Sequence, residues 1–310
     1  MDFLNAGLEL ELGNRPISPL ESVSHPLLNN IGLTLYLKRD DLIPGILSGN
    51  KFRKLLWNLR EMKRLGYTGI LTPGGAWSNH LLAVSRAGAA SGYRTTALVR
   101  GERPKQLSPV LEECLSNGMK IRWVDRSEFR SRENPSAIAG WLRNCDERTW
   151  WVPEGGSNIY GVLGARSIPQ EIQTPFDYLC LPSGTGGTLA GCIAGCARQA
   201  YTIGFPVLKG GEFLYKPVKN WLDKLATTNS GWHLDTRFHF GGYAKSTTEL
   251  DDFILDMSNH LGFQPDKIYN AKALFGLFTL IREGHFPPGS RIVYIVTQSG
   301  TPKPVGSASK

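Results

Sequence analysis

The stretch Ser48-Gly49-Asn50-Lys51-Phe52-Arg53-Lys54 joins a short strand-like segment to a strongly helical pattern. The segment before it, Leu-Thr-Leu-Tyr-Leu at 33–37, is apolar and typical of a buried strand. After it, apolar residues recur at the three- and four-residue spacing of an amphipathic helix, as Phe52, Leu55, Leu56, Leu59 and Met62. The pattern predicts a helix that begins at this stretch, with Ser48 and Asn50 as capping candidates.

Lys51 would then lie at the N-terminus of this helix. The positive end of the helix dipole disfavours an ammonium group there, and Arg53 and Lys54 add like charges. These conditions favour a neutral amine that can form a Schiff base. The alternative is an ordinary surface lysine, and on this stretch alone that interpretation is the more common one.

Length and composition narrow the class of protein. A chain of 310 residues with 41% hydrophobic residues can bury a sizeable core, and its length suggests two domains. The net charge of +8 is dispersed in pairs of Lys and Arg, which favours attraction of small anions over nucleic-acid binding. Five cysteines without CxxC spacing indicate free thiols in a reducing compartment.

The sequence shows no export or membrane signal. The start, Met1-Asp2-Phe3, lacks the basic and apolar pattern of a signal peptide. The most apolar window, 178–197, is interrupted by five glycines, which argues against a membrane span. We therefore expect a cytoplasmic protein that has neither a membrane nor a nucleic acid as its partner.

Strand-like and helix-like segments alternate along the chain. Strands are predicted at 69–72, 95–99, 120–124, 150–152, 176–181 and 291–296, and helices at 78–90, 106–117, 136–145 and 189–199. Such alternation implies parallel sheets with helices on both faces. In these folds ligands bind at the carboxyl ends of the strands, where several Gly-rich turns of this chain fall.

The clearest of these turns is Ser183-Gly184-Thr185-Gly186-Gly187-Thr188. Its glycines and small hydroxyls let backbone N–H groups converge at a helix start, a geometry that binds phosphate. It is not a P-loop, because no Gly-Lys-Ser/Thr follows, and Leu189 replaces the third glycine of a dinucleotide fingerprint. The alternative is a tight turn whose glycines serve packing alone.

Other motifs say less on their own. Ser78-Asn79-His80 follows a second Gly-rich turn, where a serine is most often a helix cap. The six histidines lack metal-ligand spacing, so no metal site is expected. No Gly-x-Ser-x-Gly motif is present, which removes the commonest serine hydrolase pattern.

Taken in order, several motifs resemble one enzyme family. They are KRDDL, SGNKFRKL, GGAWSNH, PEGGSN, the GTGGT loop and IYNAKALFGL, spread from about Leu33 to Gly300. They look like the aminocyclopropane-carboxylate deaminase and D-cysteine desulfhydrase group of pyridoxal-phosphate enzymes. That resemblance implies an α/β protein of fold type II (tryptophan synthase β-subunit-like), with two three-layer domains and mostly parallel sheets.

The resemblance also assigns roles by position. Lys51 matches the Schiff-base lysine of the cofactor, pyridoxal 5'-phosphate, and Asn79 matches the partner of its 3-oxygen. Ser78 matches a residue that contacts the substrate carboxylate and assists proton transfer. Further matches are the phosphate cup Gly184, Thr185, Gly186, Gly187 and Thr188, with Lys54 as an added phosphate contact, and the substrate-facing tyrosines Tyr243 and Tyr269.

The family's layout implies a large cofactor-binding domain of residues 1–54 and 159–310, and a small domain of residues 55–158. A homodimer is expected, and the polar tail 301–310 is expected to be flexible. The C-terminal motif differs from the usual His-Thr-Gly-Gly: Thr297 takes the threonine position without gaps, while a one-residue shift would place Ser299 there.

Three further departures bear on activity. Trp77 replaces the usual glutamine, Leu82 a common arginine, and Asn270 the glutamate of the deaminases or the small hydroxyl residue of the desulfhydrases. The resemblance implies a lyase or deaminase that releases ammonia and a 2-oxo acid from a small amino acid. Neutral partners for the pyridine nitrogen, Thr297 or Asn270, favour D-cysteine desulfhydrase-like β-elimination. The alternatives are aminocyclopropane-carboxylate deamination and a non-catalytic binding protein of the same fold.

Overall fold

The computed structural model describes residues 17–43, 49–146, 148–196, 200–227 and 231–298. These residues fall into two compact units. The first unit takes the described part of 49–165, and the second takes 17–43 together with the described part of 166–298. The second unit is therefore discontinuous in sequence.

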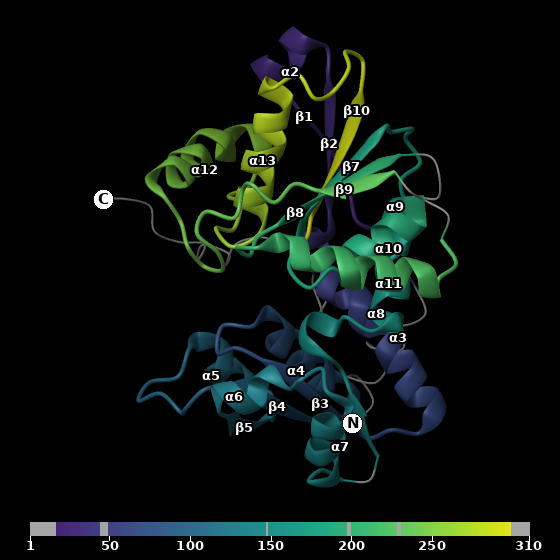
Figure 1. The fold of residues 1–310 in the computed structure, drawn as a ribbon, viewed down its shortest axis with the longest axis vertical. Helices are drawn as coiled ribbons and strands as arrows, with labels where there is room; N and C mark the ends of the chain where they lie inside the picture. Colours follow the sequence, from purple (N-terminus) through teal and green to yellow (C-terminus); the bar gives the residue numbers. More distant parts are fainter. Residues whose placement is uncertain (1–16, 44–48, 147, 197–199, 228–230, 299–310) are drawn as a thin grey trace. The chain divides into compact units, whose positions relative to one another are not determined.

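The second unit is built on a six-stranded sheet in the order β1-β2-β10-β7-β8-β9 (Figure 1). Its strands are Leu20–Val23 (β1), Thr34–Arg39 (β2), Tyr178–Ser183 (β7), Tyr201–Pro206 (β8), Trp232–Leu234 (β9) and Arg291–Val296 (β10). β1 pairs antiparallel with β2, and the other neighbouring strands are parallel. Near-continuous apolar strands such as β10 match the burial of this sheet on both faces.

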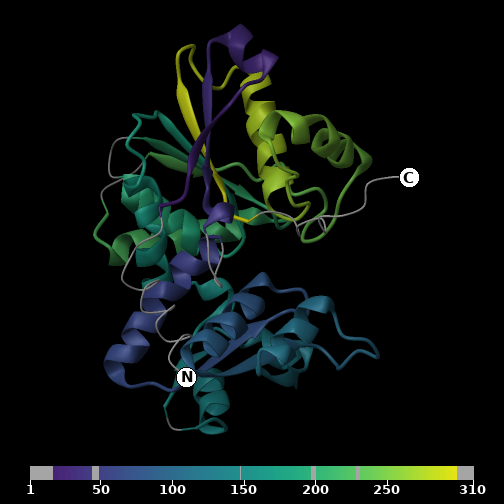
Figure 2. The same cartoon turned by 180° about the vertical axis from the view of Figure 1, so that it is seen from behind.

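Helices cover both faces of this sheet, so the second unit has three layers (Figures 1 and 2). Its helices are Pro26–Ile31 (α2), Ser167–Gln170 (α9), Gly187–Cys196 (α10), Tyr215–Lys224 (α11), Thr248–Leu261 (α12) and Asn270–Arg282 (α13), with 3-10 turns at Asp40–Leu42 (η1) and Gly211–Leu214 (η3). α12 and α13 pack with Ile203 and Phe205 of β8. A Cβ at Gly204 would instead meet Leu189 of α10, on the opposite face.

The first unit holds a four-stranded, fully parallel sheet in the order β5-β4-β3-β6. Its strands are Gly69–Gly74 (β3), Arg94–Arg100 (β4), Lys120–Val124 (β5) and Thr149–Trp151 (β6). Its helices are Asn50–Leu65 (α3), Asn79–Ser91 (α4), Pro109–Ser116 (α5), Arg126–Arg130 (α6), Pro135–Arg143 (α7) and Ile159–Ala165 (α8), with a 3-10 turn at Glu154–Gly156 (η2).

Both faces of this smaller sheet are also covered. Leu98 of β4 packs in one apolar cluster with Phe129 of α6 and Trp141 of α7. Thr95, three residues before Leu98 in β4, points to the other face. Helix α4 approaches this face so closely that a Cβ at Gly88 would lie 2.3 Å from Thr95 Cγ2. Since successive strand residues alternate in direction, α4 and the α6–α7 pair lie on opposite faces.

Helix α8 packs tightly against other backbone of the first unit. A Cβ at Gly164 would lie 1.9 Å from the carbonyl oxygen of Arg53 in α3, and one at Gly161 would lie 2.0 Å from the carbonyl oxygen of Gly156 in η2. Both glycines are therefore needed because no side-chain atom fits between the two backbones. This contact fixes the PEGGSN segment, residues 153–158, beside the first turns of α3.

The five cysteines are free thiols of unequal exposure. Cys114 in the first unit and Cys180, Cys192 and Cys196 in the second unit are buried, while Cys145 is half-buried. Burial raises the pKa of the Cys196 thiol to about 12, and it raises the pKa of Cys180 as well.

Most of the predicted elements are confirmed. The predicted strands at 120–124 and 291–296 match β5 and β10 residue for residue, and the helix predicted at 78–90 is α4. The helix predicted at 106–117 begins only at Pro109, because Ser108 caps it and accepts a bond from Leu111 N–H at 3.2 Å. The segment 126–148 holds a second helix, α6, which the prediction missed.

The α/β fold with helices on both faces of mostly parallel sheets is confirmed. The compact units place 49–54 and 159–165 with the first unit, whereas the predicted large domain included both segments. The predicted domains of 1–54 with 159–310 and of 55–158 follow a family layout and stay a prediction. The predicted tail at 301–310 lies outside the described residues.

Candidate active site

Lys51 is the second residue of α3, so its predicted place at a helix N-terminus is confirmed. Its Nζ donates to Oδ1 of Asn50 at 3.0 Å, and its side chain is half-buried. The prediction of Asn50 as a cap is wrong, because Gly49 holds that position with φ of +71° and Asn50 is the first helical residue. Ser48, the other capping candidate, lies outside the described residues.

Lys54 is fully buried in the same helix. Its Nζ donates to Oγ of Ser157 at 2.9 Å, and its Cε lies beside the backbone of Gly156 and Gly161. Burial, together with the charge of Lys51, holds the pKa of Lys54 well below the ordinary lysine value. The role of Lys54 as a phosphate contact stays a prediction.

His80 is a buried neighbour of these two lysines, and the sequence analysis gave it no role. Its Nε2 lies 2.9 Å from Oγ1 of Thr72, while its Nδ1 is buried and has no hydrogen-bond partner among the described residues. Burial, followed by the charges of Lys51 and Lys54, holds the pKa of His80 well below its ordinary value. The imidazole of His80 is therefore neutral at physiological pH.

This low pKa predicts a loss of stability in acid. Below pH about 6.5 the unfolded chain protonates His80 while the folded chain does not, so the free energy of unfolding falls as the pH falls. In His80→Gln this part of the slope, on the order of 1.4 kcal/mol per pH unit for one proton, should disappear. Urea unfolding of both proteins between pH 7.5 and 5 measures it; parallel slopes would show that folded His80 accepts the proton.

A second network, also missed by the sequence analysis, holds the PEGGSN segment on α3. Asn58 is completely buried, and its Nδ2 donates to the carbonyl of Lys54 at 2.8 Å. Its Oδ1 accepts from Nδ2 of Asn158 at 2.7 Å and from Nε1 of Trp150 at 3.2 Å. These bonds join the carbonyl of Lys54 in α3 to Trp150 and Asn158 through Asn58.

Ser78 and Asn79 lie at the start of α4, beyond the carboxyl end of β3. Ser78 is the helix cap, and its Oγ accepts from the N–H of Leu81 at 3.3 Å. As an acceptor, this hydroxyl keeps its own hydrogen for donation to a ligand. Asn79 is the first helical residue and is half-buried. Their place at a strand end and a helix start suits the binding of an anionic group.

The loop 184–188 joins β7 to α10 in the second unit. Gly186 has φ of +79°, and α10 begins at Gly187 with no acidic residue in its first turn. Thr185 is exposed and Thr188 is buried. Because the N-terminal helix dipole is not opposed by a carboxylate there, the loop has the geometry and charge of an anion site.

The two predicted tyrosines lie next to each other in the second unit. The ring centroids of Tyr243 and Tyr269 are 6.3 Å apart, at an interplanar angle of 75°. A Cβ at Gly184 would lie 3.1 Å from Cε1 of Tyr269, so the loop 184–188 and this tyrosine are in close contact. The second unit therefore brings Tyr269 to the loop 184–188, with Tyr243 packed against Tyr269.

Asn270 follows Tyr269 and is completely buried. Its Nδ2 donates to Oδ2 of Asp266 and to the carbonyl of Gln298, both at 2.7 Å. Its Oδ1 accepts from the hydroxyl of Tyr294 at 3.2 Å and from the N–H of Thr297 at 3.4 Å. Since both amide hydrogens and the oxygen have partners within the chain, Asn270 is not available to a pyridine nitrogen, contrary to one of the two possibilities considered above.

Among the described residues, Thr297 remains as the neutral candidate for the partner of the pyridine nitrogen. It directly follows β10 and is 5% exposed, and Asn270 holds its backbone in place. The alternative, Ser299, lies outside the described residues. Of the other departures from the family pattern, Trp77 is 61% exposed, and Leu82, five positions later, is half-buried.

The predicted site residues are divided between the units. Lys51, Lys54, Ser78 and Asn79 belong to the first unit, while the loop 184–188, Tyr243, Tyr269 and Thr297 belong to the second. Apart from Tyr243, which lies in the loop between β9 and α12, these residues lie at strand ends or helix starts. Within the described ranges, no cluster of three or more His, Cys, Asp or Glu side chains is suited to a metal ion. The helices in these ranges also include none that is long and apolar enough to cross a membrane.

The fold and these sites define a class, the α/β enzymes that bind an anionic cofactor at strand ends. The family model described as "Pyridoxal-phosphate dependent enzyme" matches residues 8–298. The chain belongs to this family, and its cofactor is pyridoxal phosphate. Within it, the chain is of the aminocyclopropane-carboxylate deaminase and D-cysteine desulfhydrase group, as the sequence motifs predicted.

Three relatives illustrate the similarity. The chain is 30% identical to a bifunctional D-cysteine desulfhydrase/1-aminocyclopropane-1-carboxylate deaminase of Arabidopsis thaliana, over 90% of this chain and 75% of that protein. It is 28% identical to a 1-aminocyclopropane-1-carboxylate deaminase of Pseudomonas syringae, over 92% and 91%. A crystal structure of an ACC deaminase homologue superposes with a TM-score of 0.76 at 26% identity, covering 94% of each chain.

Proposed function

We propose that the chain is a D-cysteine desulfhydrase-like lyase, which removes a β-substituent from a small amino acid and releases ammonia and a 2-oxo acid. The observation that carries this choice is the complete pairing of Asn270 within the second unit, at the position where the deaminases have glutamate. The relatives' names include both activities, so the choice rests on this chain's own residues.

The residues present fit pyridoxal phosphate. The loop 184–188 supplies backbone N–H groups and hydroxyls to a phosphate at the dipole of α10, with no competing acid in its first turn. Lys51 would supply the amine for covalent attachment, Asn79 an amide for the ring oxygen, and Thr297 a hydroxyl for the ring nitrogen. When bound, the cofactor supplies an electron sink for the charge left on the substrate's α-carbon.

The remaining chemistry belongs to protein side chains. The amine of Lys51 would act as the base that takes the α-proton of the substrate. Ser78 keeps a hydroxyl hydrogen to donate to the substrate carboxylate at the dipole of α4. Tyr243 and Tyr269 present two phenols to the substrate, one of which can donate a proton to the departing group.

Thr297 decides between the two substrates in this proposal. A carboxylate beside the ring nitrogen would keep that nitrogen protonated, whereas a neutral hydroxyl does not require it. The weaker sink expected with a neutral hydroxyl would suffice for β-elimination, because the departing group carries the electrons away. Opening a cyclopropane ring has no such departing group and would need the stronger sink.

Steady-state kinetics on the purified protein test the proposal. We expect kcat/KM for D-cysteine to exceed that for 1-aminocyclopropane-1-carboxylate, with pyruvate and 2-oxobutyrate as the measured products. The reverse order would overturn the argument from the neutral nitrogen partner and favour the deaminase. No 2-oxo acid from any of a panel of D- and L-amino acids would favour a non-catalytic binding protein. The predicted homodimer and cytoplasmic location stay predictions.

A further inference from the structure

The first turn of α13 contains a buried lysine that the proposed chemistry does not use. Lys272 is 1% exposed and is the third residue of the helix. Its Nζ donates to the carbonyl oxygen of His239 at 2.9 Å and to that of Gly242 at 2.6 Å. One ammonium group therefore bridges two backbone positions of the loop 239–244.

This location is unfavourable for a cation by itself. Burial removes the ammonium from water, and the N-terminal end of a helix repels positive charge. Burial lowers the pKa of Lys272, and the negative charge of Asp266 opposes this only in part. Besides this charge, the two carbonyl bonds compensate the burial of the ammonium group, so the lysine and the loop conformation depend on each other.

The loop itself has an unusual backbone. Phe240 and Ala244 have φ of +49° and +56°, and Gly241 and Gly242 have φ of +86° and +115°. Side chains with a Cβ rarely adopt such angles, so this loop needs external contacts to hold its shape. Internal bonds join His239 to Gly241 and Gly242, while Lys272 of α13 bonds to the carbonyl oxygens of both His239 and Gly242.

Tyr243 lies within this loop, directly after Gly242 and before Ala244. Tyr243 is 43% exposed, and its ring makes an edge contact with Tyr269, which immediately precedes α13. The backbone that carries Tyr243 is therefore held on α13 by Lys272 and by the edge contact of Phe240 with Phe275. Both tyrosines are linked to the first turn of α13. Tyr269 is linked to it directly through the chain, and Tyr243 is linked to it through the ammonium group of Lys272.

We propose that Lys272 is a positioning residue, whose ammonium fixes the loop 239–244 on α13 and thereby places the phenol of Tyr243 for the substrate. The inference rests on the proposed function only for the role of Tyr243. The loop's dependence on Lys272 is a separate physical claim, which can be measured without turnover.

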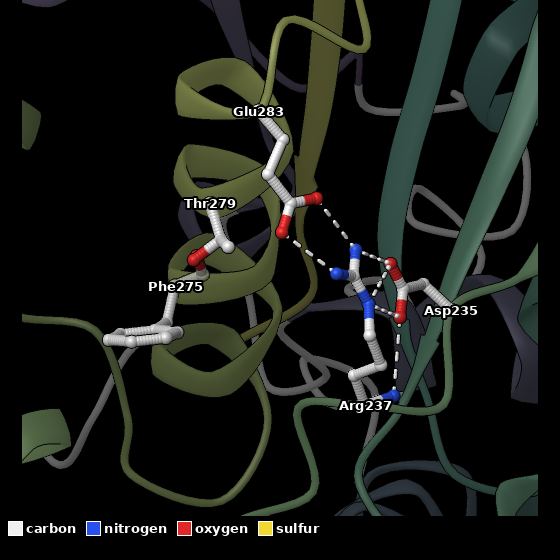
Figure 3. A network of polar contacts seen from close by, with 5 residues as sticks. All are labelled: Asp235, Arg237, Phe275, Thr279 and Glu283. Atoms are coloured by element: carbon white, nitrogen blue, oxygen red, sulfur yellow. Dashed lines mark hydrogen bonds and ion pairs between the residues drawn. The ribbon is translucent and has the colours of Figure 1, made fainter.

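A second polar link joins the residues just before the loop 239–244 to α13, and it offers a matched comparison for the effect of Lys272. Arg237 donates to Glu283 at 2.9 and 3.1 Å and to Asp235 at 2.7 Å, which ties the stretch before the loop to the C-terminal end of α13 (Figure 3). Figure 3 shows Arg237 between the two carboxylates, with Thr279 and Phe275 further along the helix. The Arg237 and Glu283 side chains are 50% and 45% exposed, so this link is screened by water.

The experiment compares Lys272→Met with Glu283→Gln in the cofactor-loaded enzyme. Hydrogen exchange of the backbone amides in 239–245 should rise by about tenfold or more in Lys272→Met and stay near wild type in Glu283→Gln. With D-cysteine, KM should rise about tenfold in Lys272→Met, with a smaller change in kcat. Lys272→Arg, which keeps the charge and the donors, should recover part of both effects.

Unchanged exchange in 239–245 for Lys272→Met would overturn the proposal whatever the activity. Faster exchange with unchanged KM would leave Lys272 as a loop anchor and overturn the placement of Tyr243. If Lys272→Met does not fold, Lys272→Gln takes its place, because its shorter side chain cannot reach both carbonyls, and the same outcomes apply. A wild-type enzyme without activity would refute the proposed function while the exchange result still stands.

Discussion

Replacing Lys51 by alanine should lower kcat by at least about 10²–10⁴-fold, the usual contribution of a positioned proton-transfer group. The variant loses both the amine for covalent attachment and the base for the α-proton. Pyridoxal phosphate should still bind without a covalent bond, because the loop 184–188 and α10 belong to the second unit and are unaffected. Absorbance titration and product release measure the two effects.

Borohydride reduction followed by peptide mapping identifies the attached lysine. The label should be on Lys51 in the wild type and also in Lys54→Met. Lys54 is the serious rival, since its burial and its low pKa also favour a neutral amine. A label on Lys54 would contradict the assignment, and the motif match of Lys51 would then be misleading.

The second large effect is expected from Gly164→Ala. Its Cβ would lie 1.9 Å from the carbonyl oxygen and 2.7 Å from the carbonyl carbon of Arg53, so one of the two helices must move. Overpacking of this kind lowers the free energy of unfolding by about 1–3 kcal/mol or more. Because Arg53 is two residues from Lys51, we also expect weaker cofactor attachment. Urea unfolding and thermal melting measure the first effect.

Gly140→Ala is the matched control in the same unit. It lies within α7, and the nearest atom to its added Cβ would be Nη2 of Arg143 at 3.7 Å, which is ordinary contact. Alanine at an unhindered helical position should stabilise the protein by about 0.5–1 kcal/mol. If Gly164→Ala were as stable as this control, the close approach of α8 to α3 would be incorrect.

The sequence predicted the parts of the fold that depend on local patterns. β5 and β10 are short apolar strands bounded by turns, and their limits were predicted without error. α6 was missed because it is a five-residue helix, too short for a periodic signal, although Asp125 caps it with bonds to Ser127 and Glu128 N–H. The helices α11 and α12 were also outside the prediction.

The candidate site was predicted through its motifs, and its supporting contacts were not. Lys272 and His80 both lie inside quoted motifs, but their environments depend on segments far away in sequence. The loop at 239–242 lies some thirty positions from Lys272. Asn270 looked like a ring partner by position, and only its four contacts reveal that it supports Thr297 instead. Periodicity and spacing carry no information on such long-range partners.

The distribution of thiols gives the protein its own reporter of unfolding. In the native state a thiol reagent has ready access only to Cys145 among the five, and a raised pKa slows even that reaction. Cys114 becomes reactive when the first unit opens, and Cys180, Cys192 and Cys196 when the second opens. Pulse alkylation with mass spectrometry can therefore follow the order in which the two units lose structure, with no engineered probe.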